Sequence, residues 1–269
     1  MLDLILPHMR CPRCGADRLQ RAPDGLCCPA CGAAYAEKDG ILDMIGDGPG
    51  GVITPFQRLM QAPAIVSIYE NSWRQLGYYL ASSRSFAREM ATVLEFGNGG
   101  AEGPTLDLAC GPGVFTRPLA RRSKGFVVGL DLSLPMLRQA ARRIRAEGIR
   151  NIQLIRASAF ALPFSDAVFP RVNCCGALHL FDRPEKALAE IARVIGPGGG
   201  FTVQTTIRPG RSAGVAYLLE RFIRFGFFDE PELGRLLGSH GFAVERDERH
   251  RISYTFLARR LPPDGMAPV

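Results

Sequence analysis

Two cysteine pairs near the start of the chain have the residue types and spacing of metal ligands. CPRCG at 11–15 recurs as CPACG at 28–32, an internal repeat that supplies four thiols. Four thiolates in two C-x2-C pairs are typical ligands of a tetrahedral zinc ion, and the following glycine permits the tight turn. A segment this small also needs a cross-link to fold, because it cannot bury a core of its own. We expect no ligand role for Cys27, which falls outside the repeat, and zinc at Cys11, Cys14, Cys28 and Cys31.

A glycine-rich turn in the middle of the chain has the features of a nucleoside site. In TLDLACGPGVF a short apolar run ends near Asp107, directly before Gly111 and Gly113. Glycines allow positive φ and let a ligand approach the backbone closely. Asp131 ends the next apolar run, VVGLD, where a carboxylate can accept hydrogen bonds from ribose hydroxyls. Thr116 stands where a pyrophosphate-binding G-x-G-x-x-G turn has its third glycine, which favours a ligand without pyrophosphate.

The elements that must position these residues alternate between strands and helices, which is typical of an α/β domain with a parallel sheet. The expected strands are 105–109, 126–131, 152–157, 171–175 and 200–206, followed by an antiparallel pair at 242–248 and 251–258. The expected helices are 116–120, 135–147, 184–194, 212–224 and 231–240.

The rest of the chain divides by composition into smaller parts. Residues 1–46 form the expected zinc ribbon, and the glycines of GILDMIGDGPGG predict a linker at 47–53. Residues 54–96 have the periodicity of two or three helices, which we interpret as a helical cap before the α/β domain at 97–260. The tail at 261–269 is expected to be disordered.

Composition limits the class of protein and its compartment. The 269 residues are 46% hydrophobic and 22% charged, as in an ordinary globular protein. The opening MLDLILPHMR lacks the basic start and cleavage site of a secretory signal, and no run approaches the roughly 20 apolar residues of a membrane helix. These features predict a cytoplasmic protein without a membrane span, in which clustered cysteines favour metal binding over disulfides.

The formal net charge of +7 raises the question of a nucleic-acid partner. Most of the basic residues are arginines scattered along the chain. The one local cluster has the spacing of a solvated helix face, which we favour over an RNA patch. Its members are Arg138, Arg142, Arg143 and Arg145, joined by Arg121 and Arg122 upstream.

Several segments, in order, resemble the class I S-adenosylmethionine-dependent methyltransferases. DLACGPG is similar to their first motif, D-x-G-x-G-x-G, with Ala109 at the first glycine position. GLDLSLPML resembles the second strand and its helix, ASAFALPF the adenine-side loop, and ALHLFDRPEKALAEIARVIGPGGGF the region between the fourth and fifth strands. The resemblance spans about 104–258. It implies a Rossmann-like, mostly parallel seven-stranded sheet with helices on both faces, and S-adenosylmethionine as cofactor.

The resemblance also implies a set of cofactor-binding residues. Those at the methionine end are Asp107, Ala109, Cys110, Gly111 and Gly113, and those at the ribose and adenine are Asp131, Leu132, Met136, Ser158, Ala159 and Phe160. Cys175 and Gly176 would end the fourth strand near the methyl sulfonium. Two positions depart from the family pattern: Ser158 replaces the acid that meets the adenine amino group, and Pro170 replaces an acid at the start of the fourth strand. Three cysteines lie at expected strand ends, and we favour small core residues over nucleophiles for them: Cys110, Cys174 and Cys175.

Two groups of methyltransferases combine a zinc ribbon with this domain. One is the rRNA guanine-N1 methyltransferases of bacteria. The other is a group of plant plastids and bacteria, related to the quinone-biosynthesis methyltransferases, which the chain resembles more in APAIVSIYENSWRQ, GALHLF and FFDEPELGRLLGSHGF. We therefore expect methyl transfer to a small, apolar or aromatic acceptor such as a quinone-like or natural-product molecule. An rRNA methyltransferase and a non-catalytic cofactor-binding protein are the alternatives.

Two features near the expected acceptor have two interpretations each. His179, in GALHLF, is a candidate general base, and a structural histidine at that turn is as compatible with the sequence. The second feature is a set of aromatic residues that could either roof an apolar pocket or belong to the core between cap and sheet. It comprises Tyr69, Trp73, Tyr78, Tyr79 and the 217–228 segment.

Overall fold

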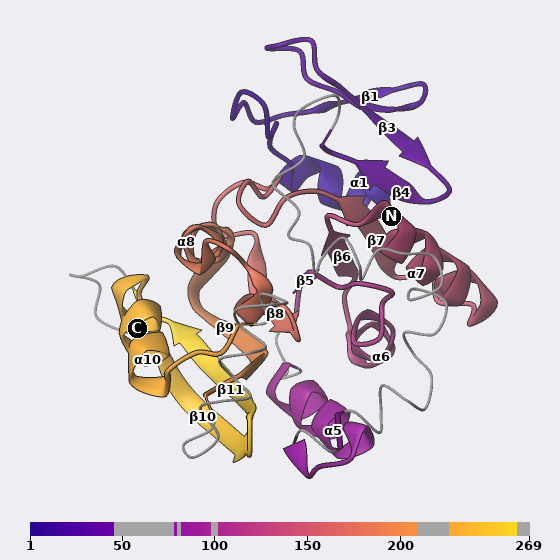
Figure 1. The fold of residues 1–269 in the computed structure, drawn as a ribbon. Coiled ribbons are helices and arrows are strands. Elements are labelled where there is room, and N and C mark those ends of the chain that lie inside the picture. The colour runs from indigo at the N-terminus through magenta and orange to yellow at the C-terminus, as the bar shows by residue number, and fades with distance from the viewer. Residues whose placement is uncertain (46–77, 80–81, 98–101, 209–225, 263–269) are drawn as a thin grey trace.

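In a computed structural model the described residues are 1–45, 78–79, 82–97, 102–208 and 226–262. They contain one sheet of eleven strands in the order β1-β2-β3-β4-β7-β6-β5-β8-β9-β11-β10 (Figure 1). The order shows that strands from the first 43 residues extend the same sheet that carries the α/β domain.

The seven strands expected from the sequence are all present. The five parallel strands are β5 (Thr105–Leu108), β6 (Val127–Asp131), β7 (Ile152–Arg156), β8 (Phe169–Cys175) and β9 (Ile195–Thr206). β11 (Ser253–Arg260) pairs antiparallel with β9, and β10 (Phe242–His250) pairs antiparallel with β11. The order reverses at β5 and β8, and the carboxyl ends on either side of such a reversal form the usual ligand crevice of an open α/β sheet.

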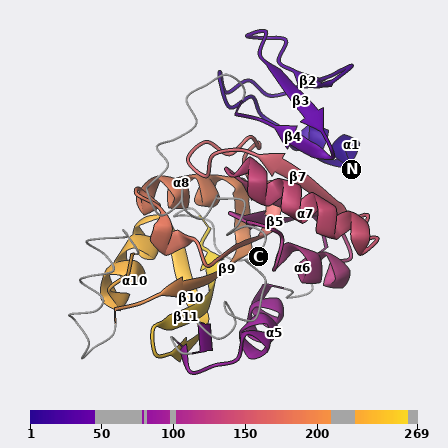
Figure 2. The ribbon, with the colours of Figure 1, turned by 45° about the vertical axis from the view of Figure 1, so that its right-hand side comes forward.

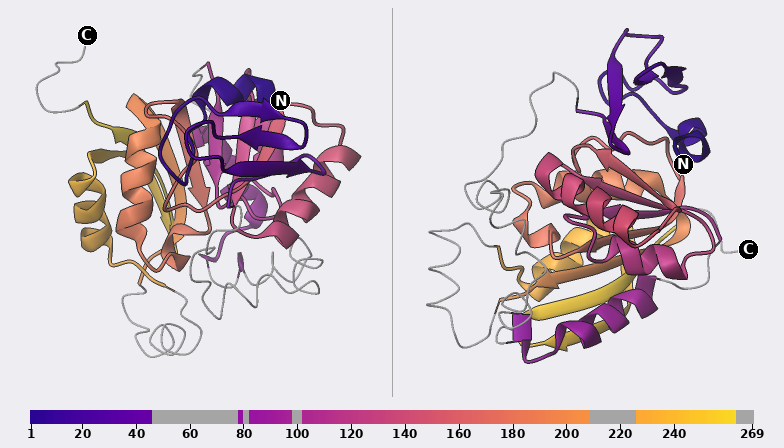
Figure 3. Two further views of the ribbon diagram at one scale, coloured as in Figure 1. Left: turned by 90° about the horizontal axis from the view of Figure 1, so that it is seen from above. Right: turned by 90° about the vertical axis from the view of Figure 1, so that its right-hand side faces the viewer.

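Helices cover both faces of the sheet, as predicted (Figures 1 and 3). On one side lie α5 (Phe86–Gly97), α6 (Thr116–Arg122) and α7 (Leu134–Ala146), and on the other α8 (Pro184–Val194) and α10 (Glu230–Ser239). Ser133 caps α7 by accepting a hydrogen bond from the Met136 backbone N–H, which fixes where this helix leaves β6. The α7 arginines that the sequence assigns to a solvated face are exposed.

The ribbon begins with α1 (Leu2–Ile5) and the short 3₁₀ turn η1 (Leu6–His8). It continues with β1 (Gln20–Ala22), β2 (Gly25–Cys27), β3 (Ala34–Lys38) and β4 (Ile41–Asp43), and it lies at the end of the sheet opposite β10 (Figure 2). β4 occupies the first residues of the segment whose glycines we interpret as a linker. Ile41 and Leu42 are buried, so this part of the segment is a core strand.

Pro170 is the second residue of β8, rather than the first as expected. The register of β8 against β9 shifts between Phe169 and Arg171, and proline is tolerated at such an irregularity because no regular ladder bond is lost. No helix within the described ranges is long and apolar enough to cross a membrane. The expected linker at 47–53, the helix at 212–224 and most of the cap and tail fall outside the described residues.

Candidate functional site

The turn after β5 combines three residues in the left-handed region. Ala109 has φ 54°, Gly111 φ 55° and Gly113 φ 80°. A side chain added at Gly111 would meet no heavy atom of the described chain within 4 Å, so this part of the turn is open to a ligand. A side chain at Gly113 would instead meet the Ala140 Cβ at 3.3 Å. Gly111 therefore allows close approach of a ligand, whereas Gly113 lets α7 pack behind the turn.

Asp131, at the end of β6, is tied to this turn. The Gly111 N–H donates to Asp131 Oδ2 at 2.8 Å, and the Ser133 N–H donates to Oδ1 at 2.8 Å. Burial raises the pKa of Asp131 above its usual value, while these backbone donors lower it. Each carboxylate oxygen has a further lone pair, so the group is able to accept hydrogen bonds from a ribose.

Asp107 lies beneath the turn and is 1% exposed. The Thr116 hydroxyl donates to its Oδ2 at 2.5 Å, and burial raises the pKa of Asp107 to about 7. This hydrogen bond joins the residues on either side of the turn and therefore stabilises its conformation. The sequence interpretation missed Thr116 as the partner of Asp107, although its place at the missing third glycine of the motif marks it.

The loop after β7 holds the residues expected at the adenine. The Ala157 N–H donates to the Asp131 carbonyl oxygen at 3.2 Å, and the Phe160 N–H donates to Ser158 Oγ at 3.2 Å. The Phe160 ring meets the Phe181 ring edge-on at 5.8 Å between centroids, and the Arg183 guanidinium lies 4.9 Å from the Phe160 ring centroid. The loop is thus attached to the backbone of Asp131, the expected ribose acceptor, and the Phe160 ring is held in place by its neighbours.

β8 ends at Cys175, and Gly176 follows with φ 78°. The Gly176 N–H donates to the Gln204 carbonyl oxygen at 2.8 Å. Within the described chain, a side chain at Gly176 would meet only Gln204 Oε1, at 3.6 Å. Burial raises the pKa of the Cys174, Cys175 and Cys110 thiols, so they remain protonated and uncharged.

His179 lies in the 3₁₀ turn η2 (Leu178–Leu180) and is 9% exposed. Its Nδ1 is 3.2 Å from Thr205 Oγ1, and burial lowers the pKa of His179 to about 3. Gly226 approaches the His179 backbone so closely that a side chain there would overlap the carbonyl oxygen. This environment favours a structural histidine, and the role as a base stays a prediction.

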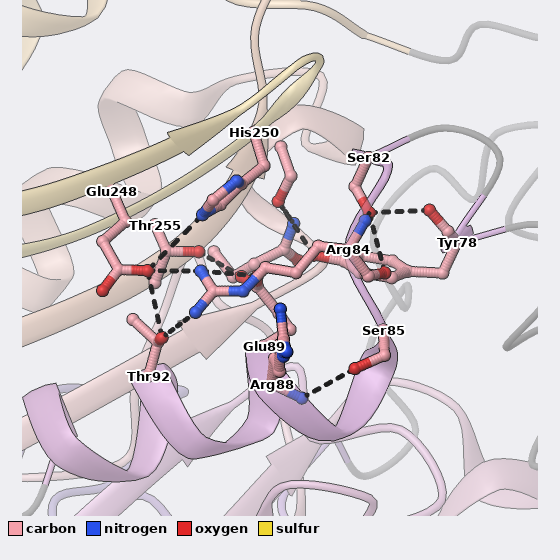
Figure 4. Close-up of polar contacts among 12 residues, drawn as sticks. Tyr78, Ser82, Arg84, Ser85, Arg88, Glu89, Thr92, Glu248, His250 and Thr255 are labelled. Carbon is pink, nitrogen blue, oxygen red and sulfur yellow. Dashed lines mark hydrogen bonds and ion pairs between the residues drawn. The ribbon is translucent and has the colours of Figure 1, made fainter.

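A polar network joins the start of α5 to β10 and β11 (Figure 4). Arg84 donates to Glu248, whose Oε2 also accepts from the Thr92 hydroxyl at 3.1 Å. Glu89, which is 1% exposed, accepts a hydrogen bond from the Thr255 hydroxyl. Because Arg84 and Glu248 are 164 positions apart, no local pattern in the sequence could have revealed this network.

The network continues toward Gly176. Tyr78 Oη and Ser253 Oγ are 3.0 Å apart, and Gln204 Nε2 donates to Ser253 Oγ at 3.0 Å. The Tyr78 ring also meets Phe86 edge-on at 5.7 Å between centroids.

Of the aromatic residues considered for a roof or for the core, Tyr79 is 53% exposed, which is against the core interpretation for this residue. Phe228 packs against the main core. Tyr69, Trp73 and residues 217–225 lie outside the described residues.

The four cysteines of the two pairs come together as predicted. Their Sγ atoms all lie within 4.8 Å of one another, and Cys27 is not part of the group. Cys11 Sγ is 3.7 Å from Cys31 Sγ, and Cys14 Sγ is 3.6 Å from Cys28 Sγ. Tetrahedral zinc with bonds of about 2.3 Å places its sulfur ligands about 3.8 Å apart, so the thiols fit such an ion.

Comparisons with known proteins agree with this geometry. Residues 105–199 match the family model described as a methyltransferase domain. Two chloroplastic methyltransferases of Arabidopsis thaliana are 30% and 29% identical over 217 and 232 residues, 74% and 82% of this chain and 61% and 62% of those proteins. The chain thus spans less than two thirds of either plant protein.

A bacterial enzyme is covered more fully. The demethylmenaquinone methyltransferase of Lactiplantibacillus plantarum is 36% identical over 172 residues, 61% of this chain and 70% of that protein. The fold is shared with an S-adenosylmethionine-dependent methyltransferase of Aquifex aeolicus, at a TM-score of 0.58 and 20% identity over 74% of this chain and 98% of that one. From the turn geometry, the domain match and these relatives, the chain belongs to the S-adenosylmethionine-dependent methyltransferases.

Proposed function

We propose that the protein transfers the methyl group of S-adenosylmethionine to a small, apolar or aromatic acceptor of the quinone-like kind. The observation that carries this proposal is the Asp131 carboxylate bonded to the open backbone of Gly111, at the adjacent carboxyl ends of β6 and β5. A nucleoside fits there, since a ribose requires an acceptor and the turn offers room beside it. The likeness to solved structures supports only the fold.

The residues present fit the cofactor from one end to the other. Asp131 would accept hydrogen bonds from the ribose, Leu132 and Phe160 would flank the adenine, and the Ala109–Gly111 backbone would face the methionine part. When bound, the cofactor supplies an electrophilic methyl group on a positively charged sulfonium. Methyl transfer is an in-line displacement, so the main task of the chain is to orient the two reactants.

The nature of the acceptor is inferred from the relatives. Demethylmenaquinone methyltransferases of several bacteria are 36–40% identical over parts of this chain, and their name states a quinone substrate. The Gln204–Ser253–Tyr78 hydrogen bonds next to Gly176 would give such an acceptor a polar partner beside the sulfonium.

The ribbon does not separate the rRNA alternative from the proposal. Phosphate binding would need cationic side chains there. Arg10 forms an ion pair with Asp166 at 3.7 Å and Arg21 with Asp3 at 2.6 Å, whereas the Arg13 and Arg18 side chains are exposed. We also propose that the four-cysteine group holds zinc, in a reducing compartment such as the cytoplasm where the thiols remain available.

Calorimetry with S-adenosylhomocysteine tests the cofactor site. The parent should bind, and Asp131→Ala should weaken binding about 10- to 150-fold, because one or two hydrogen bonds to a charged acceptor are lost. Asp247→Ala, which removes an exposed carboxylate on β10, serves as the control and should leave the affinity unchanged. Equal affinity for the parent and Asp131→Ala would contradict the assignment.

Turnover tests the acceptor class. With S-adenosylmethionine and a demethylated naphthoquinol, the parent should release S-adenosylhomocysteine. Salt-sensitive methylation of stripped ribosomal RNA in its place would favour the rRNA alternative. Binding of S-adenosylhomocysteine without turnover on quinols, phenols or RNA would favour a non-catalytic cofactor-binding protein.

A further inference from the structure

The last strand of the ribbon pairs with the strand that leads into the expected adenine-side loop. β4 pairs in parallel with β7, with Leu42 opposite Ile155 and Asp43 opposite Arg156. Leu42 is fully buried, and the Met44 N–H donates to the Arg156 carbonyl oxygen at 2.8 Å. The strand that leads into the adenine-side loop is therefore paired along one side by the ribbon rather than by the catalytic domain.

One side chain carries this pairing into the site itself. Arg156 Nη1 donates to Asp43 Oδ2 at 2.8 Å, and Arg156 Nε donates to the Leu132 carbonyl oxygen at 3.2 Å. Leu132 directly follows Asp131, the expected ribose acceptor. The Ile45 N–H donates to Asp43 Oδ1 at 3.1 Å, which holds the carboxylate toward Arg156. Asp43 of the ribbon is thus two hydrogen bonds away from the backbone beside Asp131.

The other end of the loop also forms hydrogen bonds with the ribbon. The Arg10 N–H donates to the Pro163 carbonyl oxygen at 3.1 Å, and the Ser165 N–H donates to the His8 carbonyl oxygen at 2.9 Å. The Ser165 hydroxyl donates to Asp17 Oδ1 at 2.9 Å. Ribbon residues therefore hold both ends of the 157–165 loop, which carries Ser158, Ala159 and Phe160.

The four-cysteine group lies between the two ribbon segments that contact the ends of the loop. Cys11 directly follows the 8–10 segment that holds one end of the loop. The second pair, Cys28 and Cys31, precedes β3, which pairs with β4. A metal ion bound by both pairs would fix the distance between the two segments.

We propose that the ribbon is a supporting wall of the cofactor site, in which Asp43 acts as a positioning residue through Arg156 and metal binding tightens the hold on the cofactor. The inference rests on the proposed function, because it takes the 157–165 loop to face the adenine.

A second support holds the loop from the opposite side. The Leu162 N–H donates to Glu190 Oε2 at 2.6 Å, and Arg193 of α8 donates to the carbonyl oxygens of Leu162 and Phe164. If α8 alone fixed the loop, the ribbon contacts would have no effect on the cofactor. The experiment must therefore separate the two supports.

Calorimetry with S-adenosylhomocysteine compares the parent with Asp43→Asn, measured together with zinc content and melting temperature. We expect Asp43→Asn to raise the Kd about 3- to 30-fold, the usual range for coupling through one contact, with zinc retained. Hydrogen exchange without ligand should show faster exchange of the 157–165 amides in this variant. The matched control is Glu37→Gln, which removes one negative charge from an ion pair with Arg21 inside the ribbon.

An unchanged Kd and unchanged exchange in Asp43→Asn would overturn the inference and leave α8 as the sufficient support. An equal loss in Glu37→Gln would also overturn it, because any change of charge in the ribbon would then suffice. If Asp43→Asn does not fold, the parent is stripped with a chelator and reloaded with Zn²⁺. A Kd for S-adenosylhomocysteine that rises on stripping and returns on reloading supports the inference, and a constant Kd rejects it. A parent that never binds S-adenosylhomocysteine refutes the proposed function instead.

Discussion

The two halves of the proposed cofactor site are supported in different ways. The ribose and methionine half lies at the ends of β5 and β6, where the Gly111–Asp131 and Thr116–Asp107 hydrogen bonds join adjacent parts of one domain. The adenine half lies after β7, where the contacts come from the ribbon on one side and α8 on the other.

The difference follows from the position of the strands in the sheet. β5 and β6 each have neighbours on both sides within the catalytic domain, whereas β7 has one such neighbour and takes β4 as its other. An edge strand offers unpaired backbone groups that need a partner. The ribbon supplies this partner, so the proposed adenine half has a contact that the catalytic domain does not provide.

The largest expected effect is on the adenine half, through the ribbon that supports it. Substituting Cys28→Ser together with Cys31→Ser should abolish zinc binding and lower the free energy of unfolding by more than about 4 kcal/mol, because the ribbon loses its cross-link. Elemental analysis and chemical denaturation measure both. Cys27→Ser, next to the site but outside the group, is the control and should retain one zinc per chain. Hydrogen exchange should increase in the 157–165 loop and stay constant at 111–113; equal increases in both would remove the distinction between the halves.

A smaller effect is expected in the ribose and methionine half, where Asp107 changes the dependence of stability on pH. The pKa of Asp107 is raised to about 7 in the folded state, so the folded chain binds this proton more tightly than the unfolded chain. Its contribution to stability is present at low pH and is lost as the pH rises from about 4 to about 7. Asp107→Asn can still accept from Thr116 but does not ionise. Between pH 5 and 8, the ligand-free parent should lose about 2 kcal/mol of unfolding free energy relative to this variant. If the unfolding free energies of the parent and Asp107→Asn depend on pH in the same way, the pKa of Asp107 is not raised in the folded state.

The smallest effect concerns the turn itself. Ala109 has φ 54°, a conformation that glycine adopts without strain, so Ala109→Gly should raise the free energy of unfolding by about 0.5–1 kcal/mol. Ala189→Gly, at an exposed position inside α8, is the control and should lower it by a similar amount. Chemical denaturation measures the free energy of unfolding of both variants and shows whether each substitution raises or lowers it. A loss of stability in Ala109→Gly would mean that the methyl group contributes more by packing than the conformation costs.

Much of the ribose and methionine half was predictable from local patterns. The apolar runs before Asp107 and Asp131 indicated strands, and the glycines after them indicated turns of positive φ, because both signals depend on neighbouring residues. The two C-x2-C pairs likewise predicted the four-thiol group. The contacts of Arg156 with Asp43 and of Arg84 with Glu248 were not predictable, since each joins residues more than 100 positions apart.

The sequence by itself determined the order along the chain of the seven strands of the α/β domain, the turn with its facing carboxylate, and the four cysteines that come together in the ribbon. These depend on backbone sterics, burial and ligand chemistry, which act over a few residues. The tertiary structure alone decided that Ile41–Asp43 is a strand of the catalytic sheet and that Arg156 joins Asp43 to the Leu132 carbonyl oxygen. The physical reason is that the exposed edge of β7 needs a partner, and which segment satisfies it is settled only when the chain is packed.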